Sequence, residues 1–352
     1  MSIIIGHSLN INIWLETMAS VLLGFSGGID STTAAERLQS EGYRVVAITI
    51  DTMLKPSTIE RAKNRAKELG IEWYLYDGRE RFERDIIDYF CSEYAMGCTP
   101  APCTRCNSLI KWQILIEEAE RLGIEYIATG HYFQVVQHNG LCYVVKGVDS
   151  TKDQSYYLWG LTQDMLRRAL TPMGTLLKRE VKENFQDKSE SMGVCFLDGR
   201  SYAEFLESRG VEMLHGEIVD EHGVVCGYHN GVARYTIGQR RGEGLGDGMR
   251  VVDIDAQRNR IVVGGKASLY KHTLYVSQCN IVDVNELLSP DDVTIKIRGI
   301  GLNPEQAVTI ERCGDGFKVV TRDASFAPAK GQPLVFYRQN RVIGGGIVVE
   351  FN

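Results

Sequence analysis

Three cysteines stand where their spacing could support chemistry. Cys103 and Cys106, in the stretch TPAPCTRCNSLIKW, are separated by two residues, and Cys195 follows within SMGVCFLDGR. Cys-x-x-Cys pairs ligate metals and iron–sulfur clusters, form redox couples, or combine a nucleophile with a resolving thiol. Ordinary packing of Cys103 is less favoured, because Pro102 and polar residues flank it. The spacing alone leaves these chemistries open.

The cysteine content as a whole indicates the redox context. The chain of 352 residues has nine cysteines, an odd number at irregular spacing, and is too long for a small disulfide-bonded scaffold. This favours a reducing compartment, the cytoplasm, with a few reactive thiols among inert ones. We expect structural roles for the other six, which are Cys91, Cys98, Cys142, Cys226, Cys279 and Cys313.

A second set of residues forms a candidate phosphate-binding loop, SGGIDS, at residues 26–31. Gly27 and Gly28 let backbone N–H groups turn toward an anion at a helix N-terminus. Asp30 would repel phosphate unless Mg²⁺ lay between them, so it is a candidate Mg²⁺ ligand. The loop is neither a Walker A motif nor GxGxxG, and a ligand-free, capped glycine turn is the alternative. The expected nucleotide-binding residues are Gly24, Phe25, Ser26, Gly27, Gly28, Ile29, Asp30, Ser31, Ile50 and Gly130.

Apolar strands and amphipathic helices alternate through the first part of the chain. The predicted strands are residues 21–23, 43–50, 71–77 and 124–131, and the predicted helices are residues 32–40, 58–70 and 108–123. This order predicts an α/β fold with a doubly wound parallel sheet and chemistry at the carboxyl ends of its strands. His131 lies at such an end, as either a neutral core histidine or a site residue.

The residue composition and the expected secondary structure change twice along the rest of the chain. Residues 20–160 are expected to form the nucleotide-binding domain, and residues 161–211 a charged, helical linking module. Residues 212–352 have short alternating strands with glycine-rich turns, which predict β-barrels. Residues 1–19 resemble no signal peptide and are expected to be an extension or a misassigned start. The net charge of −6 neither supports nor excludes an RNA partner.

The loop SGGIDS resembles that of the N-type ATP pyrophosphatases, which have a HUP-like fold. Later motifs resemble, in order, one branch of that group, the tRNA-specific 2-thiouridylase family, from about residue 20 to the C-terminus. The motifs that carry this resemblance are CNSLIKW, ATGHY, KDQSYYL, SMGVCFLDGR, YHNGVARYTIGQRRGEGLG and GQPLVFY with GGGIV.

The resemblance implies a reaction and a substrate. ATP, with Mg²⁺, would adenylate the C2 oxygen of the wobble uridine (U34) in tRNA of the Lys, Glu and Gln type, and sulfur would then replace that oxygen. The donor would be a persulfide carrier protein or sulfide. The base would have to flip out of its stack to reach ATP. The residues that the resemblance assigns to tRNA are His131, Lys152, Asp153, Gln154, Arg240, Arg298 and Gln332.

Residue 103 departs from the family pattern. The family has the sequence Asn-Pro-Asp at this place, whereas this chain has Ala101, Pro102 and Cys103, so a cysteine replaces the aspartate. In one interpretation, Cys195 carries a persulfide and Cys106 is the nucleophile, with Lys111 or Arg105 lowering its pKa.

In the other interpretation, which we favour from the sequence, Cys103, Cys106 and Cys195 hold a 4Fe–4S cluster whose fourth iron binds hydrosulfide. Zinc at the same residues would explain no sulfur transfer. The rival functions are an amide-forming ATP pyrophosphatase, a non-catalytic tRNA-binding module and a redox or iron–sulfur sensor.

Overall fold

A computed structural model describes residues 18–183, 193–289, 291–298 and 305–352. The predicted N-terminal extension therefore lies, up to residue 17, outside the described residues. In the described part of the chain, no helix is long and apolar enough to cross a membrane.

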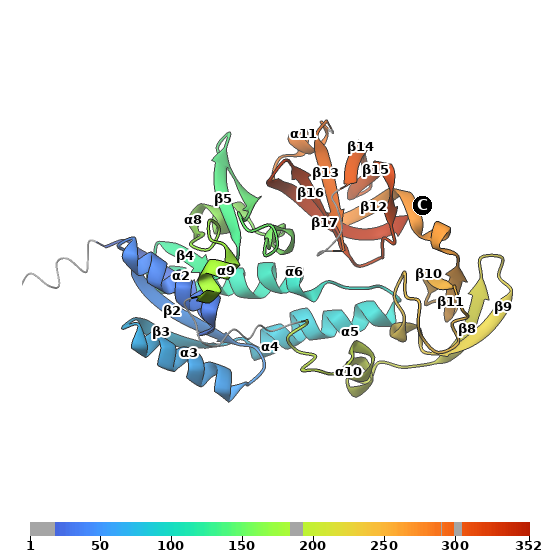
Figure 1. The fold of residues 1–352 in the computed structure, drawn as a ribbon, viewed down its shortest axis with the longest axis horizontal. Helices are drawn as coiled ribbons and strands as arrows, with labels where there is room; N and C mark the ends of the chain where they lie inside the picture. The colour runs from blue at the N-terminus through green and yellow to red at the C-terminus, as the bar shows by residue number, and fades with distance from the viewer. Residues whose placement is uncertain (1–17, 184–192, 290, 299–304) are drawn as a thin grey trace, which may run out of the picture.

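The predicted parallel sheet is confirmed (Figure 1). Its strand order is β3-β2-β1-β4-β7, with bounds β1 Ser20–Gly24, β2 Arg44–Asp51, β3 Glu72–Asp77, β4 Tyr126–Thr129 and β7 Ala169–Leu170. The short strand β7 falls in the segment expected to be a linking module. Its two residues pair with Ile127 and Ala128 of β4, so this segment adds a fifth strand to the sheet.

Alternate side chains of β1 fill two separate cores. Val21 and Leu23 pack on one face with α2 and α3, whereas Leu22 packs on the other face with Trp112 and Leu115. Both faces are covered, which explains why the central strands have continuous apolar runs rather than an alternating pattern. The helices around the sheet are α2 Ile29–Ser40, α3 Pro56–Glu68, α7 Trp112–Leu122, α8 Gln163–Arg168 and α9 Lys178–Glu183.

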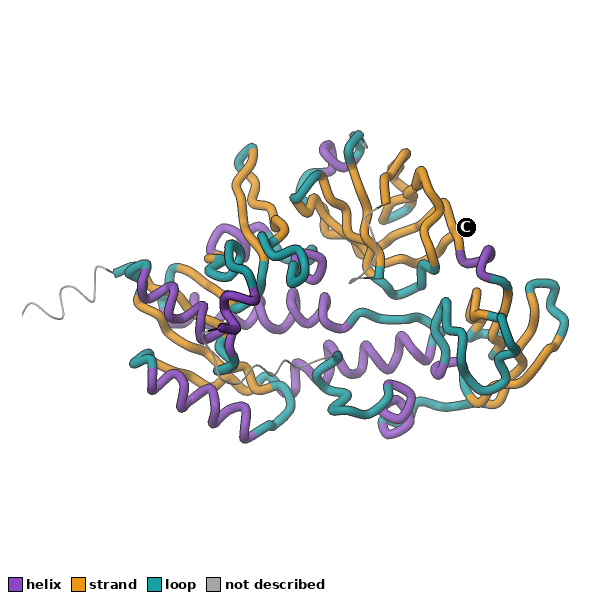
Figure 2. Tube along the Cα trace, viewed as in Figure 1, coloured by secondary structure: helices purple, strands orange, loops and turns teal. Residues whose placement is uncertain are grey.

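Two interrupted helical rods run away from the sheet and lie side by side (Figures 1 and 2). The first consists of α4 Arg79–Phe82, a π turn η1 at Glu83–Ile87 and α5 Asp88–Ala95. The second consists of α6 Pro102–Cys106, a π turn η2 at Asn107–Lys111 and α7. The helix predicted from residue 108 thus starts at Pro102, a residue favoured in the first helical turn. Cys103 and Cys106 therefore lie about one turn apart on a helix.

The predicted β-rich region is confirmed as a small sheet and a barrel. The small sheet has the order β10-β11-β8-β9, from β8 His215–Asp220, β9 Val225–Asn230, β10 Arg250–Asp255 and β11 Arg260–Gly264. The six-stranded antiparallel barrel closes through pairing of β12 with β17. Its strands are β12 Tyr270–Ile281, β13 Val293–Ile297, β14 Glu305–Cys313, β15 Gly316–Phe326, β16 Pro333–Arg338 and β17 Arg341–Phe351.

Short elements complete the described part of the fold. They are the helices α10 Tyr202–Ser208 and α11 Val284–Leu287, and the 3₁₀ turns η3 Ser155–Leu158, η4 Val232–Arg234 and η5 Lys266–Leu269.

A hairpin of β5 (Phe133–His138) and β6 (Leu141–Lys146) joins the nucleotide-binding domain to the barrel. The Tyr143 hydroxyl donates to Glu286 at 2.9 Å, and Arg341 of β17 donates to the same carboxylate at 2.8 Å. Buried residues of β16 and β17 share one continuous core with the nucleotide-binding domain. The hairpin therefore fixes the barrel against the domain that precedes it.

Candidate active site

A cavity of about 330 Å³ opens at the carboxyl ends of β1, β2 and β4, where doubly wound sheets bind their ligands. It brings together eleven of the predicted site residues: Gly24, Phe25, Ser26, Asp30, Ser31, Ile50, Cys106, Gly130, His131, Gln154 and Cys195. It also has lining residues that the sequence analysis did not name: Ile48, Thr49, Thr52, Phe82, Leu115 and Thr129. Thr49 and Thr129 are polar residues near the ends of buried strands, a signal that could have identified them.

The predicted phosphate loop is a tight turn against α3. Gly27 has φ +67°, and a Cβ on it would lie 2.7 Å from the Cα of Ala62. The Gly28 N–H donates to the Ser26 hydroxyl, and the Ser26 N–H donates to the Ser31 hydroxyl, each at 3.3 Å. These long, weak bonds can be exchanged for bonds to a phosphate. Gly27 and Gly28 form the turn and Ile29 is the first residue of α2; nucleotide binding by the loop stays a prediction.

Asp30 is the carboxylate of this loop and faces a buried cation. The ammonium group of Lys178, at the start of α9, lies 2.6 and 2.8 Å from its two oxygens, and the Tyr132 hydroxyl donates to it at 2.8 Å. The role of Asp30 as a Mg²⁺ ligand stays a prediction. The sequence analysis missed Lys178, because the residue lies in a charged helical segment 148 positions away from Asp30.

Two of the three predicted cysteines, Cys106 and Cys195, line the same cavity, whereas Cys103 is not part of its lining. Cys106 is buried, whereas Cys103 and Cys195 are exposed. Burial raises the pKa of Cys106 to about 11; the ammonium of Lys111 opposes this rise, and the neighbouring Cys195 and Cys103 add to it. Burial likewise raises the pKa of Cys103, again against the effect of Lys111. The thiols are thus close enough to influence one another, and the raised pKa keeps Cys106 protonated at neutral pH.

The cluster interpretation assigns Cys103, Cys106 and Cys195 as iron ligands. Among the described residues, no three His, Cys, Asp or Glu side chains are positioned to hold a metal ion. Cysteine sulfur suits iron chemically, but the observed arrangement does not form a ligand set. The 4Fe–4S cluster therefore stays a prediction, with Cys103, Cys106 and Cys195 as the residues that would hold it.

Arg105 and Lys111, the two residues predicted to lower the pKa of Cys106, point in different directions. The Nε of Arg105 donates to the carbonyl of Asp85 at 2.8 Å, and its guanidinium lies 4.4 Å from the ring centroid of Tyr89. Lys111 lines the cavity, and its charge acts on Cys103 and Cys106. The geometry therefore selects Lys111 over Arg105.

His131 is a neutral group in the wall of the cavity. Its Nδ1 lies 2.7 Å from the hydroxyl of Thr129, which also accepts the His131 N–H at 3.3 Å. Burial lowers the pKa of His131 to about 3, and the nearby charge of Lys111 lowers it further. The neutral ring can exchange hydrogen bonds with a ligand but adds no charge at physiological pH.

This lowered pKa predicts an acid-dependent loss of stability. The unfolded chain binds a proton at His131 below about pH 6.5, whereas the folded chain does so only near pH 3. Stability therefore rises with pH across this window and falls on acidification. Going from pH 7 to pH 5, His131 should cost about 2 kcal/mol of unfolding free energy. Urea unfolding at both pH values should show this extra loss in the wild type but not in His131→Asn. An equal loss in both proteins would contradict the assignment.

The residues predicted to contact tRNA around position 153 are partly used by the fold. The Gln154 side chain accepts the Tyr132 N–H at 2.9 Å and lines the cavity. Asp153 accepts bonds from the Gly147 N–H at 3.0 Å and from the Ser155 N–H and hydroxyl at 3.1 and 2.8 Å. Asp153 thus shapes the turn, and Lys152 is half-buried at its surface.

The predicted contacts in the β-rich region are spread out. Arg240 is exposed. Arg298 is largely buried and donates to the carbonyls of Ile237 and Ala327, both at 3.0 Å. Gln332 donates to the carbonyl of Thr99 at 2.7 Å. The fold therefore brings none of these three into the cavity, and it uses Arg298 and Gln332 to hold neighbouring backbone.

Comparison with known proteins accounts for almost the whole described chain. Residues 19–199 match the family described as tRNA methyl transferase HUP domain, residues 203–265 its PRC-barrel domain, and residues 271–348 the aminomethyltransferase β-barrel domain. The fold and these matches together thus define a HUP-domain protein with a PRC-barrel domain and a C-terminal β-barrel domain.

Full-length relatives narrow this class. A tRNA-specific 2-thiouridylase MnmA of Carboxydothermus hydrogenoformans is 39% identical over 93% of this chain and 97% of its own. One of Bacteroides fragilis is 39% identical over 95% of both chains, and one of Clostridium perfringens is 34% identical over 94% of this chain and 99% of its own. The chain belongs to the tRNA-specific 2-thiouridylase family and is a sulfurtransferase enzyme.

Proposed function

We propose that the enzyme converts the wobble uridine, U34, of tRNA to 2-thiouridine at the expense of ATP. One observation carries the proposal: Cys106 and Cys195 line the same cavity as the phosphate-loop residues Ser26, Asp30 and Ser31. An amide-forming ATP pyrophosphatase has no need of two cysteines beside its phosphate loop. The names of the full-length relatives support tRNA as the substrate.

The first step uses the phosphate-loop residues of the cavity lining. The C2 oxygen of uridine attacks the α-phosphate of ATP, and the bond between the α- and β-phosphates breaks to release pyrophosphate. The loop N–H groups and the helix N-terminus of α2 bind the phosphates. Bound Mg²⁺ would neutralise phosphate charge, with Asp30 as its carboxylate ligand. The product carries AMP on C2, which leaves far more readily than oxide.

The second step uses the cysteines of the cavity lining. The terminal sulfur of a persulfide on Cys195 bonds to C2, the bond between C2 and the adenylated oxygen breaks, and AMP leaves. The Cys106 thiolate then attacks the Sγ of Cys195, which frees 2-thiouridine and leaves a Cys106–Cys195 disulfide. Reduction by a dithiol restores both thiols. The outer sulfur of that persulfide comes from a persulfide carrier protein, whose own cysteine leaves as a thiolate; sulfide would be the donor only in the cluster alternative.

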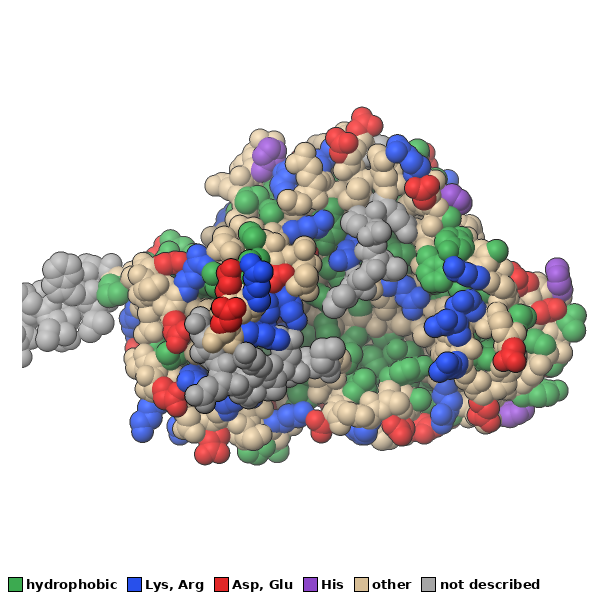
Figure 3. All heavy atoms as spheres, in the orientation of Figure 1, with side chains coloured by type: hydrophobic (Ala, Val, Ile, Leu, Met, Phe, Trp, Pro, Cys, Tyr) green, Lys and Arg blue, Asp and Glu red, His purple; other side chains and the backbone are tan. Residues whose placement is uncertain are grey.

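The RNA partner would be tRNA of the Lys, Glu or Gln type, bound in the cytoplasm. Figure 3 shows Lys and Arg side chains gathered along the side of a central hollow that is nearest the four-stranded sheet. Such a basic wall suits the phosphate backbone. Arg240 is the exposed candidate contact, and His131 and Gln154 are the candidates inside the cavity.

The function is tested with purified enzyme, ATP, Mg²⁺, an unmodified tRNA-Glu transcript and, in separate reactions, either a persulfide donor with a dithiol or sulfide. Nucleoside mass spectrometry should show 2-thiouridine at U34 with an equal amount of AMP. Cleavage of ATP without tRNA, or amide formation from ammonia, would point instead to a synthetase.

The cluster alternative is tested by the iron and acid-labile sulfide content of anaerobically prepared enzyme. About four irons per chain, lost in each of Cys103→Ser, Cys106→Ser and Cys195→Ser, would support it. Activity without iron would support the persulfide relay.

A further inference from the structure

Lys111 is a cation in the cavity lining, which it shares with Cys106 and Cys195. No described carboxylate forms an ion pair with its ammonium, although the side chain lines the cavity beside Cys106, His131 and Cys195. Its charge acts on Cys103, Cys106 and His131. The positive charge therefore faces the place where sulfur must meet the base.

A π turn, η2, puts Lys111 on that side of the helix. In a regular α-helix, five residues exceed a full turn by about 140°, so Lys111 would point away from Cys106. In the π turn of Asn107–Lys111, the Trp112 N–H donates to the Asn107 carbonyl, five positions back. Residues five apart then lie on the same side of the helix, in agreement with Cys106 and Lys111 lining one cavity.

Side chains hold this turn in place. Widening a helix leaves carbonyls unpaired, and the Ser108 hydroxyl lies 3.2 and 3.3 Å from the carbonyls of Thr104 and Arg105. The Asn107 amide donates to the Tyr157 carbonyl at 3.1 Å. Gly160 lies so close to Ser108 that a Cβ on it would be 3.1 Å from the hydroxyl.

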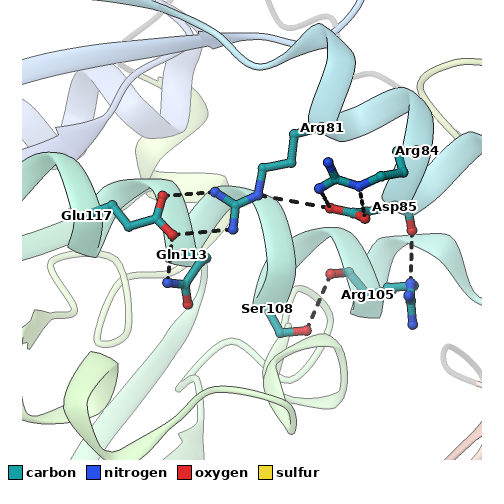
Figure 4. Close-up of polar contacts among 7 residues, drawn as sticks. All are labelled: Arg81, Arg84, Asp85, Arg105, Ser108, Gln113 and Glu117. Carbon is teal, nitrogen blue, oxygen red and sulfur yellow. Dashed lines mark hydrogen bonds and ion pairs between the residues drawn. The ribbon is translucent and has the colours of Figure 1, made fainter.

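The facing π turn, η1, is tied to the same segment (Figure 4). Arg105 reaches across to the carbonyl of Asp85 within η1. Arg81 of α4 forms a two-pronged ion pair with Glu117 of α7, with N–O distances of 2.8 and 3.3 Å. The two helical rods therefore fix the backbone from which Lys111 projects.

We propose that Lys111 is a catalytic residue of sulfur transfer, placed by the π turn to hold the anionic sulfur nucleophile against adenylated C2. This inference rests on the proposed function. As the C–S bond forms and the C–O bond breaks, negative charge moves from sulfur to the departing AMP. An ammonium group that already stands beside the sulfur and the leaving oxygen stabilises that charge, because the surroundings need not rearrange during the reaction. Adenylation occurs at the phosphate loop and does not need this cation.

The test separates the two steps in Lys111→Met, Lys111→Arg and the wild type. Lys67→Met, an exposed lysine of α3, is the matched control. With radiolabelled ATP and tRNA, Lys111→Met should form adenylated tRNA at close to the wild-type rate. Its 2-thiouridine formation should fall about a hundredfold, the usual effect of losing one transition-state contact. Lys111→Arg should recover part of the loss, and Lys67→Met should match the wild type.

Each other outcome has a distinct meaning. Thiolation by Lys111→Met at the wild-type rate would overturn the inference while leaving the proposed function intact. Equal loss of adenylation and thiolation would overturn it too, because Lys111 would then act in ATP or tRNA binding. No 2-thiouridine from the wild type would refute the proposed function itself. Thermal unfolding of Lys111→Met should match the wild type, since the side chain is exposed.

Discussion

Cys106→Ser and Cys195→Ser are each expected to make no detectable 2-thiouridine while still adenylating tRNA. Serine keeps the size of the side chain but is a far weaker nucleophile and cannot carry a persulfide. The phosphate-loop residues Ser26, Asp30 and Ser31 belong to a separate segment of the cavity lining and keep their geometry. We expect thiolation to fall more than about a thousandfold, as for loss of a nucleophile acting as part of a unit. Adenylated tRNA should accumulate, as seen with radiolabelled ATP.

Cys103→Ser distinguishes the two sulfur chemistries. The relay predicts nearly full thiolation, because Cys103 is exposed and does not line the cavity. The cluster predicts complete loss, as for the other two variants. Cys313→Ser, at an exposed position of β14, is the control that should match the wild type. Full activity of Cys106→Ser would contradict both chemistries.

Gly27→Ala is expected to abolish ATP cleavage, whereas Gly28→Ala should retain much of it. A Cβ at Gly27 would lie 2.7 and 2.9 Å from backbone atoms of Ala62, and the φ of +67° is unfavourable for alanine. The backbone of α3 cannot yield as a flexible side chain would, so the loop must shift. At Gly28, a Cβ meets only the Ser26 hydroxyl, at 3.4 Å, and the backbone is extended at φ −82°.

The measurement is AMP release with saturating tRNA, together with ATP binding by calorimetry. Gly27→Ala should lose more than about a hundredfold in turnover, because misplaced donors no longer match the phosphates. Gly28→Ala should lose less than about tenfold. Equal activity of the two variants would show that the contact with Ala62 does not shape the loop.

The parts of the site that could be predicted from the sequence are those that depend on short stretches of neighbouring residues. The loop at residues 26–31 follows an apolar strand and opens a helix, so its place at the sheet edge followed from chain order alone. His131 was placed at the end of a strand for the same reason. Cys106 and Cys195 were paired only by the family resemblance, and the cavity lining now joins them.

The parts that could not be predicted depend on long-range contacts or on subtle backbone changes. Strand β7 has two residues, too few for any periodicity. Lys178 becomes part of the site only because α9 packs back on α2. The residues of the π turn at Asn107–Lys111 are of types that also occur in ordinary α-helix, so the sequence does not mark the turn. Tertiary contacts accommodate its extra residue. Arg298 and Gln332 were expected to face RNA, but backbone carbonyls of other segments engage them.

The β5–β6 hairpin has a consequence for how a base can reach the cavity. Tyr143 and Val145 of the hairpin are anchored to the barrel. This attachment leaves the parallel sheet and the barrel little freedom to move apart or together around a bound tRNA. The anticodon loop of the tRNA then has to change shape instead, by unstacking the wobble base and flipping it into a cavity that is already formed. Selection among tRNAs would therefore depend on how easily each anticodon loop distorts, as well as on the groups that it presents.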